Sequence, residues 1–300
     1  MYSMKDLLTL TQYQAYCKVK QVINKFPKDS IRFKDGKYLV MNVDDNNPKP
    51  MLCVHLDTIN TSYNVTPTSD MIDYNKDKQV YSLNFKGKQA CRCLGGDDRA
   101  GLWVLLHVLF NKEIAKEYCY GVFFDEEVGG LGSTAYAKDY KNHEDSVKCF
   151  IGLDRRGYNQ CATYGSDNTE LINILIDNYD YVEASGTFTD ASNISYDVAC
   201  VNLSVGYENE HRVEEIVDMH GAKKALETLT TLYSKLDKKQ YEVEYKPNNY
   251  NNFDWSKYKT LDDGDFNDPI LCDCCGSHSP LYDYEGYHIC EECLPLYKGY

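Results

Sequence analysis

The sequence lacks three features that would assign whole classes of function. It has no surplus of basic residues, since 46 acidic residues outnumber 32 Lys and Arg and give a net charge of −14. This charge argues against nucleic acid or an anionic membrane surface as a main partner. No apolar run is long enough to span a bilayer, and the first residues, "MYSMKDLLTL", lack the pattern of a signal peptide. We therefore expect a cytoplasmic protein without a membrane partner.

The chain is large enough for a substantial core. Its 300 residues, 43% of them hydrophobic, fit one large domain, or one domain with a small appendage. No internal repeat is evident. The acidic balance suits a site for cations, either metals or amines. Of the 13 cysteines, eight lie between Cys17 and Cys200, mostly inside apolar runs, and we expect small buried thiols in a reducing compartment.

Apolar patterning predicts strands that alternate with helices. The predicted helices cover 3–26, 99–111, 133–140, 169–179 and 213–236, and the predicted strands cover 37–43, 51–56, 80–85, 120–127, 147–154 and 199–206. This alternation is typical of an α/β protein, a three-layer sandwich around a mostly parallel central sheet. We expect that domain to occupy residues 1–240. Residues 241–269, rich in Asn, Asp, Lys and Tyr, are predicted to be a linker to a small module at 270–300.

Acids and histidines gather at the ends of the apolar segments. They fall in five places, which hold His55 and Asp57, Asp97 and Asp98, Glu126 and Glu127, Asp154, and His211. In open α/β sheets the carboxyl ends of the strands line the ligand crevice, so one edge could collect all five groups. Any one of these residues alone is more often a helix cap or a solvated loop charge. Imidazole together with carboxylates is the ligand chemistry of Zn²⁺, and carboxylates can bridge two ions.

The pair Asp97 and Asp98 raises a particular question, because it directly precedes the apolar run "LWVLLHVLF". Adjacent carboxylates repel each other, and burial is costly for both unless a positive charge compensates them. Either the pair faces water as a helix cap, or a cation binds there. His55 and Asp57 have strand spacing, which places both side chains on one face and lets the carboxylate orient the imidazole.

The ordered set of motifs "HLD", "GGDDRAG", "EEVGGLG", "GLDRRG" and "ENEHR" resembles the co-catalytic dizinc exopeptidases. These include leucyl-type zinc aminopeptidases, peptidase T, deblocking aminopeptidases and acylamino-acid deacylases. The resemblance covers about residues 37–235 and implies two active-site zinc ions, or cobalt or manganese. It implies that Asp97 bridges both metals, that His55 and Asp154 complete one, and that Glu127 and His211 complete the other.

The same resemblance assigns the remaining roles. Glu126 is expected to be the general base, Asp57 to orient His55, and Asp98 to support the ligands without binding metal. The implied reaction is hydrolysis of an amide bond by a water that two metals activate, most plausibly removal of an N-terminal residue from a peptide. One alternative is an amidohydrolase or deacylase acting on small N-acyl or amide metabolites. Another is an inactive homologue that acts as an adaptor through its zinc module.

One spacing distinguishes the subfamilies. Deacylases and peptidase T insert a dimerisation or lid domain of about a hundred residues before the last His. Here Asp154 and His211 are only 57 positions apart, which leaves no room for such a domain. Between them, "TFTDAS" resembles the family's Thr-Asp segment near the site. Asp190 in that segment is expected either to bind a substrate amine or support a ligand, or to cap a helix.

The C-terminal cysteines form two Cys-x₂-Cys pairs. Four thiolates close a tetrahedron around a structural zinc ion, and the predicted ligands are Cys272, Cys275, Cys290 and Cys293. The alternatives are a disulfide pair or free thiols. Cys274 is expected to be a spare thiol or a supporting residue, and His278 and His288 are less favoured ligands. This tail resembles a zinc ribbon or treble clef, and its acidic sequence favours a protein partner over nucleic acid.

Overall fold

The computed structural model describes residues 2–140, 146–165 and 167–244, and the backbone of two strands beyond them. The chain divides into two units, Met1–Lys246 and Pro247–Tyr300. In the second unit, β13 (Leu281–Tyr284) and β14 (Tyr287–Cys290) pair antiparallel, with Asp283 opposite His288.

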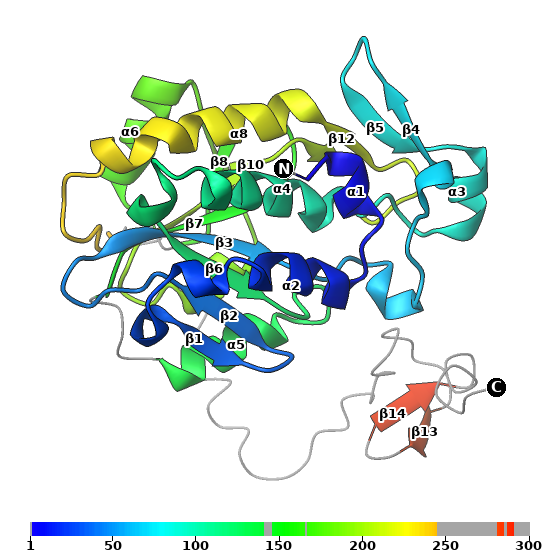
Figure 1. The fold of residues 1–300 in the computed structure, drawn as a ribbon, viewed down its shortest axis with the longest axis horizontal. Coiled ribbons are helices and arrows are strands. Elements are labelled where there is room, and N and C mark those ends of the chain that lie inside the picture. The colour runs from blue at the N-terminus through cyan, green and yellow to red at the C-terminus, as the bar shows by residue number, and fades with distance from the viewer. Residues whose placement is uncertain (1, 141–145, 166, 245–280, 285–286, 291–300) are drawn as a thin grey trace, which may run out of the picture. The chain divides into compact units, whose positions relative to one another are not determined.

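The first unit contains one large sheet, one small sheet and helices on both faces of the large sheet (Figure 1). The strands of the large sheet, in spatial order, are β1 (Arg32–Lys34), β2 (Tyr38–Met41), β6 (Cys119–Phe123), β3 (Lys49–His55), β7 (Val147–Arg155), β10 (Cys200–Ser204), β8 (Gln160–Thr163) and β9 (Val182–Ser185). The small antiparallel sheet contains β11 (Tyr207–Glu208), β12 (Ile216–Asp218), β5 (Val80–Leu83) and β4 (Ile72–Asn75).

The helices are α1 (Met4–Leu8), α2 (Gln12–Lys20), α3 (Phe85–Ala90), α4 (Gly96–Phe110), α5 (Leu131–Asp139), α6 (Thr169–Tyr179), α7 (Asp190–Ile194) and α8 (Met219–Leu232). Short 3₁₀ helices occur at Ile23–Lys25, Lys28–Ser30, Thr61–Tyr63, Ser69–Met71, Ala115–Glu117 and Tyr233–Lys235. Among the described residues, no helix combines the length and the apolar composition that crossing a bilayer requires.

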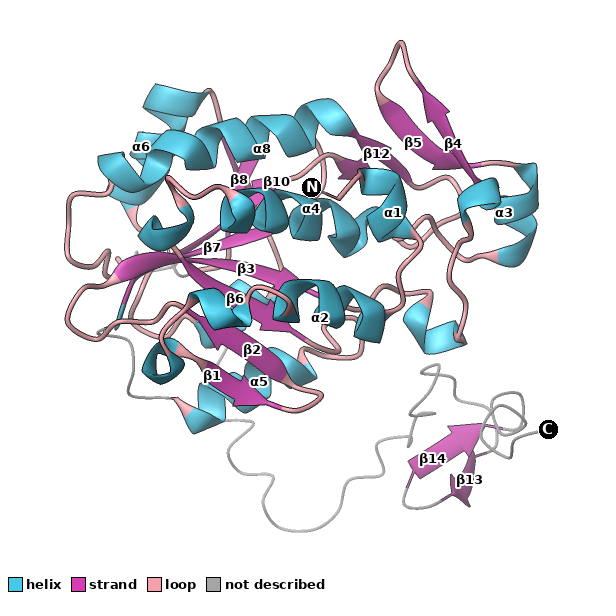
Figure 2. Ribbon diagram, in the orientation of Figure 1, coloured by secondary structure: helices cyan, strands magenta, loops and turns pink. Residues whose placement is uncertain are grey.

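The centre of the large sheet is parallel. β3 runs parallel to both β6 and β7, and β7 runs parallel to β10. The pairs β1–β2, β2–β6 and β8–β10 are antiparallel, while β8–β9 is parallel. Helices cover both faces of this sheet (Figure 2). The central strands are therefore buried on both sides, and their sequences are nearly continuous apolar runs. The predicted fold class, an α/β sandwich with a mostly parallel sheet, is confirmed.

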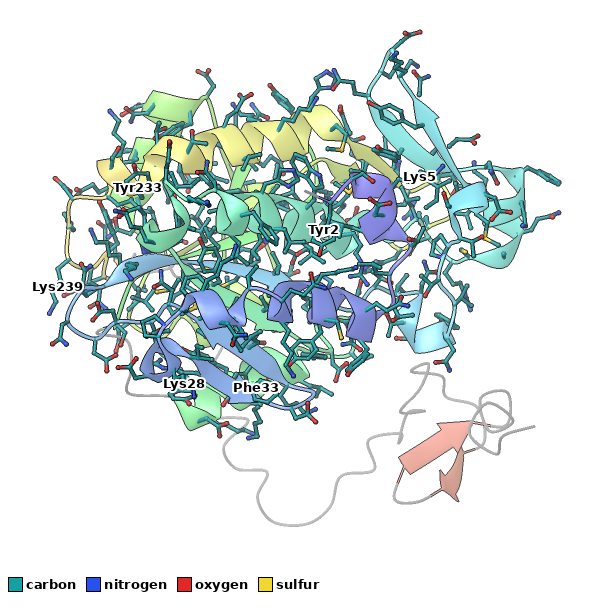
Figure 3. The ribbon with its side chains drawn as sticks, in the orientation of Figure 1. Tyr2, Lys5, Lys28, Phe33, Tyr233 and Lys239 are labelled. Carbon is teal, nitrogen blue, oxygen red and sulfur yellow. The ribbon has the colours of Figure 1, made fainter. Side chains whose placement is uncertain are left out.

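Two apolar cores occupy the two faces of the sheet. The larger core joins α1, α2, α4, α6 and α8 to one face, and α4 and α8 lie side by side on it (Figure 1). The smaller core joins α5 and α7 to the other face. The N-terminal segment is fastened to the larger core, since the ring of Tyr2 lies edge-on to Phe110 of α4 with 6.2 Å between centroids (Figure 3).

Two predicted helices differ from the structure. The helix expected over 3–26 is divided into α1 and α2, because Thr11 forms a capping box with Gln14 and starts a new helix. The helix expected from 213 begins only at Met219, where Asp218 caps α8, and the preceding residues form β12. At both positions the apolar spacing continues through the helix start, but the side chains of Thr11 and Asp218 cap a new helix there and decide where it begins.

Several short elements were not predicted, namely β1, β4, β8, β9, β11, α3 and α7. The strand expected over 120–127 ends at Phe123, so Glu126 and Glu127 lie in the following loop, where Asp125 has a left-handed φ of 59°. The eight cysteines from Cys17 to Cys200 are free, and all except the half-buried Cys17 are buried, as predicted.

Candidate metal centre

Three adjacent strands bring the predicted residues together at one sheet edge. His55 ends β3, Asp154 lies one residue before the end of β7, and the loop after β6 carries Glu126 and Glu127. These strands are neighbours in the order β6–β3–β7, and they run in the same direction. Their carboxyl ends therefore meet, which is where open α/β sheets bind ligands.

The first group of possible metal ligands consists of His55, Asp97 and Asp154, each offering an atom within 4.8 Å of the others. Nε2 of His55 lies 2.9 Å from Oδ1 of Asp97 and 3.6 Å from Oδ1 of Asp154. His55 is only 1% exposed. Its burial opposes the charged imidazolium, but contacts with Asp154, Asp57 and Asp97 outweigh this and raise its pKa well above the ordinary value.

The second group consists of Asp97, Glu127 and His211, within the same 4.8 Å limit. Nε2 of His211 lies 2.9 Å from Oε2 of Glu127 and 3.4 Å from Oδ2 of Asp97. The hydrogen bonds to Asp97 and Glu127 raise the pKa of His211 to about 11. Asp97 belongs to both groups, with one carboxylate oxygen facing each histidine. This is the pairing that the sequence motifs predict.

The segment around Asp97 is shaped by glycines. Gly95 has a φ of +83°, a conformation that favours glycine, and Asp97 and Asp98 have non-helical backbone angles at the start of α4. Gly101 lies against β7 so closely that a Cβ atom there would be 1.8 Å from the carbonyl oxygen of Leu153. Any side chain at position 101 would therefore push α4 away from the strand that carries Asp154.

Asp98 does not face water. Its side chain is fully buried, Oδ1 accepts a hydrogen bond from the backbone N–H of Gly101 (2.9 Å), and Oδ2 accepts one from that of His55 (3.3 Å). Burial raises its pKa well above the ordinary value, and the carboxylate of Asp154 adds to the effect. Asp98 thus joins the start of α4 to the end of β3, behind the ligand groups. The reading of the pair as a solvated helix cap does not fit this burial.

Asp57 connects two parts of the site. Oδ1 lies 3.3 Å from Nδ1 of His55 and accepts a hydrogen bond from the backbone N–H of Glu126 (3.0 Å). Oδ2 accepts one from the backbone N–H of Glu127 (3.0 Å). Burial opposes the charge on Asp57, but these contacts, led by His55, lower its pKa. A single carboxylate therefore fixes the orientation of an imidazole and the path of the loop that carries both glutamates.

A cavity of about 250 Å³ opens over the two groups. Its lining residues are Asp97, Glu126, Glu127, Asp154, Arg155, Arg156, Tyr164, Gly186, Thr187, Phe188, Tyr207, Glu210 and His211. Burial raises the pKa of Glu126 to about 9 and that of Asp154 to about 6. Nearby carboxylates act in the same direction in both cases, because several acids share one small volume.

Asp190 is not among the residues that line this cavity. It is the first residue of α7 and only 3% exposed. Burial raises its pKa to about 7. The capping residue of α7 is Thr189, which forms a capping box with Ser192 and also donates a hydrogen bond to Oδ2 of Asp154 (3.2 Å).

Two buried residues of this region were not predicted from the sequence. Glu215 is completely buried and accepts hydrogen bonds from the backbone N–H groups of Gly95 and Asp97. Arg99 is 1% exposed and donates hydrogen bonds to the carbonyl oxygens of Leu56 (2.7 Å) and Leu10 (3.0 Å). The only sequence feature that could have pointed to Arg99 is a single basic residue directly before an apolar run. No sequence pattern points to Glu215, because its hydrogen-bond partners are far away in sequence.

The predicted tail site falls almost entirely outside the described residues. Cys272, Cys275 and Cys293 lie there, and Cys290 is described only as the last backbone position of β14. The four-thiolate zinc site therefore stays a prediction.

No protein-family model and no curated protein matches this sequence. Solved structures do match its fold. A tripeptidase from Staphylococcus aureus is 15% identical, with a TM-score of 0.56 over 78% of this chain and 97% of that chain. The TET1 peptidase from Pyrococcus horikoshii, which can assemble into a tetrahedron or a large octahedral shell, is 11% identical, with a TM-score of 0.56 over 77% of this chain and 99% of that chain.

The aminopeptidase PepT from Bacillus cereus is 14% identical, with a TM-score of 0.53 over 78% of this chain and 97% of that chain. At such low identity the likeness concerns the fold. The first unit of this chain thus has the α/β fold that is found in these aminopeptidases and tripeptidases.

Proposed function

We propose that this chain is a metal-dependent hydrolase that removes N-terminal residues from peptides. The observation that carries the proposal is the position of Asp97, whose two carboxylate oxygens face two separate groups of possible ligands. The names of its structural neighbours, which are aminopeptidases and tripeptidases, support a peptidase on the same fold.

The donor set fits a pair of zinc, cobalt or manganese ions. Each group offers one imidazole and two carboxylates, which is the donor chemistry of such ions. Three protein ligands per ion leave coordination positions open, as catalytic sites require and closed structural sites do not. Two dications would also compensate the crowded acids, whose burial otherwise raises the pKa values of Glu126, Glu127 and Asp154.

His55, Asp97 and Asp154 would hold one ion, and Asp97, Glu127 and His211 the other. When bound, the pair supplies Lewis acidity, which polarises a substrate carbonyl and lowers the pKa of a water molecule. Glu126 borders the same cavity without belonging to either ligand group. Its carboxylate takes a proton from the attacking water and delivers it to the leaving amine. Asp57 holds both Glu126 and His55 in place for this step.

The remaining predicted residues have supporting roles. Asp190 is buried and directly follows Thr189, which donates a hydrogen bond to Asp154, so we propose that it supports this ligand. For the C-terminal module we propose one structural zinc ion held by Cys272, Cys275, Cys290 and Cys293, with a protein as its possible partner.

The adjacent glutamates provide the test. Glu126→Gln should keep its metals and fold but lose about two to four orders of magnitude in turnover, the usual contribution of a general base. Glu127→Ala should lose metal as well as activity. Both variants are assayed on free-amine peptides and on N-acylated amides, with added Zn²⁺, Co²⁺ or Mn²⁺, next to metal analysis.

Near-normal turnover by Glu126→Gln contradicts the assigned mechanism. Loss of metal from that variant means that the two roles are exchanged. Cleavage of N-acylated amides alone identifies a deacylase instead of an aminopeptidase. Absence of any cleavage in the metal-loaded wild type supports an adaptor.

A further inference from the structure

The cavity over the metal groups has two arginines in its lining, Arg155 and Arg156, which directly follow Asp154. They differ in their partners. Arg156 is bound to an acid, since its Nη1 lies 2.7 Å from Oε1 of Glu210. Arg155 uses only Nε, which donates to Oε1 of Gln160 at 2.9 Å. Among the described residues, no atom accepts a hydrogen bond from Nη1 or Nη2 of Arg155.

The guanidinium of Arg155 is therefore held at Nε, while Nη1 and Nη2 have no acceptor among the described residues. The Nε bond to Gln160 joins the end of β7 to the start of β8. The strand end itself is held by Asn202, which bonds to both the backbone N–H and the carbonyl of Asp154 (2.8 Å each). A guanidinium fixed in this way presents its two terminal nitrogens as a planar fork, the geometry that binds a carboxylate in bidentate fashion.

The charge pattern indicates what the fork binds. Arg155 lines the same cavity as Asp97, Asp154 and His211, three of the proposed metal ligands. Bound metal ions would add positive charge to this cavity and would repel a guanidinium that has no anionic partner. An anion between the cations removes this repulsion, and no described acid forms an ion pair with Arg155. We therefore infer that the anion that pairs with it comes from outside the described residues.

We propose that Arg155 binds a carboxylate of the substrate, so that the preferred substrates are short peptides with an anionic group close to the cleaved bond. This inference rests on the proposed function and names its substrate class. The cavity of about 250 Å³ is small for a ligand site, so the anion must lie within a residue or two of the metals. It is either the C-terminal carboxylate of a short peptide or the side chain of an acidic residue.

Two matched substrate pairs distinguish these sources. Ala-Ala-Ala is compared with Ala-Ala-Ala-amide, and the p-nitroanilide of Glu with that of Gln. For each pair the ratio of kcat/KM, charged over neutral, is measured for the wild type, Arg155→Gln and Arg155→Lys. Arg156→Gln is the matched control, because it removes an adjacent arginine that already has an acidic partner.

The wild type should prefer the charged member of one pair. Arg155→Gln should reduce that ratio about 10- to 100-fold, mainly through KM, because a charged hydrogen-bond pair is lost. Arg155→Lys keeps the charge without the fork and should retain part of the preference. Arg156→Gln should retain all of it. Circular dichroism and thermal melting check that every variant is folded.

Cleavage without a charge preference, or a preference that survives in Arg155→Gln, overturns the inference and leaves the hydrolase function intact. If only Arg156→Gln loses the preference for the charged substrate, Arg156 binds the carboxylate and the proposal for Arg155 is wrong. If the metal-loaded wild type cleaves nothing, the proposed function fails. The inference is then decided by calorimetry with Ala-Ala-Ala and its amide, where equal binding by wild type and Arg155→Gln overturns it.

Discussion

Oε1 of Glu215 accepts a hydrogen bond from the backbone N–H of Asp97 at 3.0 Å. The other oxygen, Oε2, accepts one from Gly95 at 2.6 Å. Glu215 follows His211 by four residues, in the connection between β11 and β12. One completely buried carboxylate therefore joins the segment that carries the shared ligand to the segment that carries His211.

We predict that Glu215→Gln weakens zinc binding about 10- to 100-fold, the usual effect of losing a group that orients metal ligands. The amide keeps one acceptor but turns an NH₂ group toward a backbone N–H. The adjacent Glu214→Gln is the control, because it makes the same charge change at an exposed position. Zinc affinity is measured by competition with a chelating dye. Equal affinities for the two variants would show that Glu215 has only a structural role.

Asp57→Asn should lower both turnover and zinc affinity without unfolding the protein. Asp57 accepts from the backbone of Glu126 and of Glu127 and contacts Nδ1 of His55, and an amide cannot satisfy all three. The loss of turnover should be about tenfold or more. Asp73→Asn, at an exposed position in β4, is the control. Unchanged turnover and zinc affinity in Asp57→Asn would show that Asp57 does not position His55 or the two glutamates.

Zinc affinity of the site should rise with pH. Without metal, Asp97 and Glu127 raise the pKa of His211 to about 11, and the pKa of His55 is also raised, so both imidazoles are protonated at neutral pH. Zinc binds only neutral imidazole, so it must displace these protons. We expect affinity to increase about tenfold per pH unit for each displaced proton.

Competition titrations between about pH 6 and pH 8 test this linkage, in a Cys275→Ser background that removes the predicted tail site. His220→Asn is the control, because this exposed histidine contacts Asp218 outside the site. An affinity that does not change with pH would mean that the histidines are not ligands.

The C-terminal module is predicted to bind one further zinc ion. Cys275→Ser or Cys290→Ser should reduce the metal content from about three ions per chain to about two, because four thiolates close a structural site. A module this short depends on its metal to fold, so the same variants should unfold it and leave the hydrolase unit folded. Cys274→Ser is the control. Elemental analysis that gives the same zinc content for all three variants would contradict the four-thiolate assignment.

The sequence alone identifies those site residues that lie at the ends of predicted strands. His55, Asp154 and the two glutamates could be placed at one edge because parallel strands share a direction. Glu215 could not be found, because its partners lie about 120 positions earlier and only the folded chain joins them. The break at Thr11 was missed for a different reason, since a local capping box outweighed apolar spacing.

The most direct test of the central claim is a zinc anomalous difference map from crystals of the zinc-loaded protein. We predict two peaks about 3.5–4 Å apart at the carboxyl ends of β3 and β7, with Asp97 between them. His55 and Asp154 should contact one peak, and Glu127 and His211 the other. A single peak, or none, at this position in crystals grown with excess zinc would contradict the two-metal hydrolase.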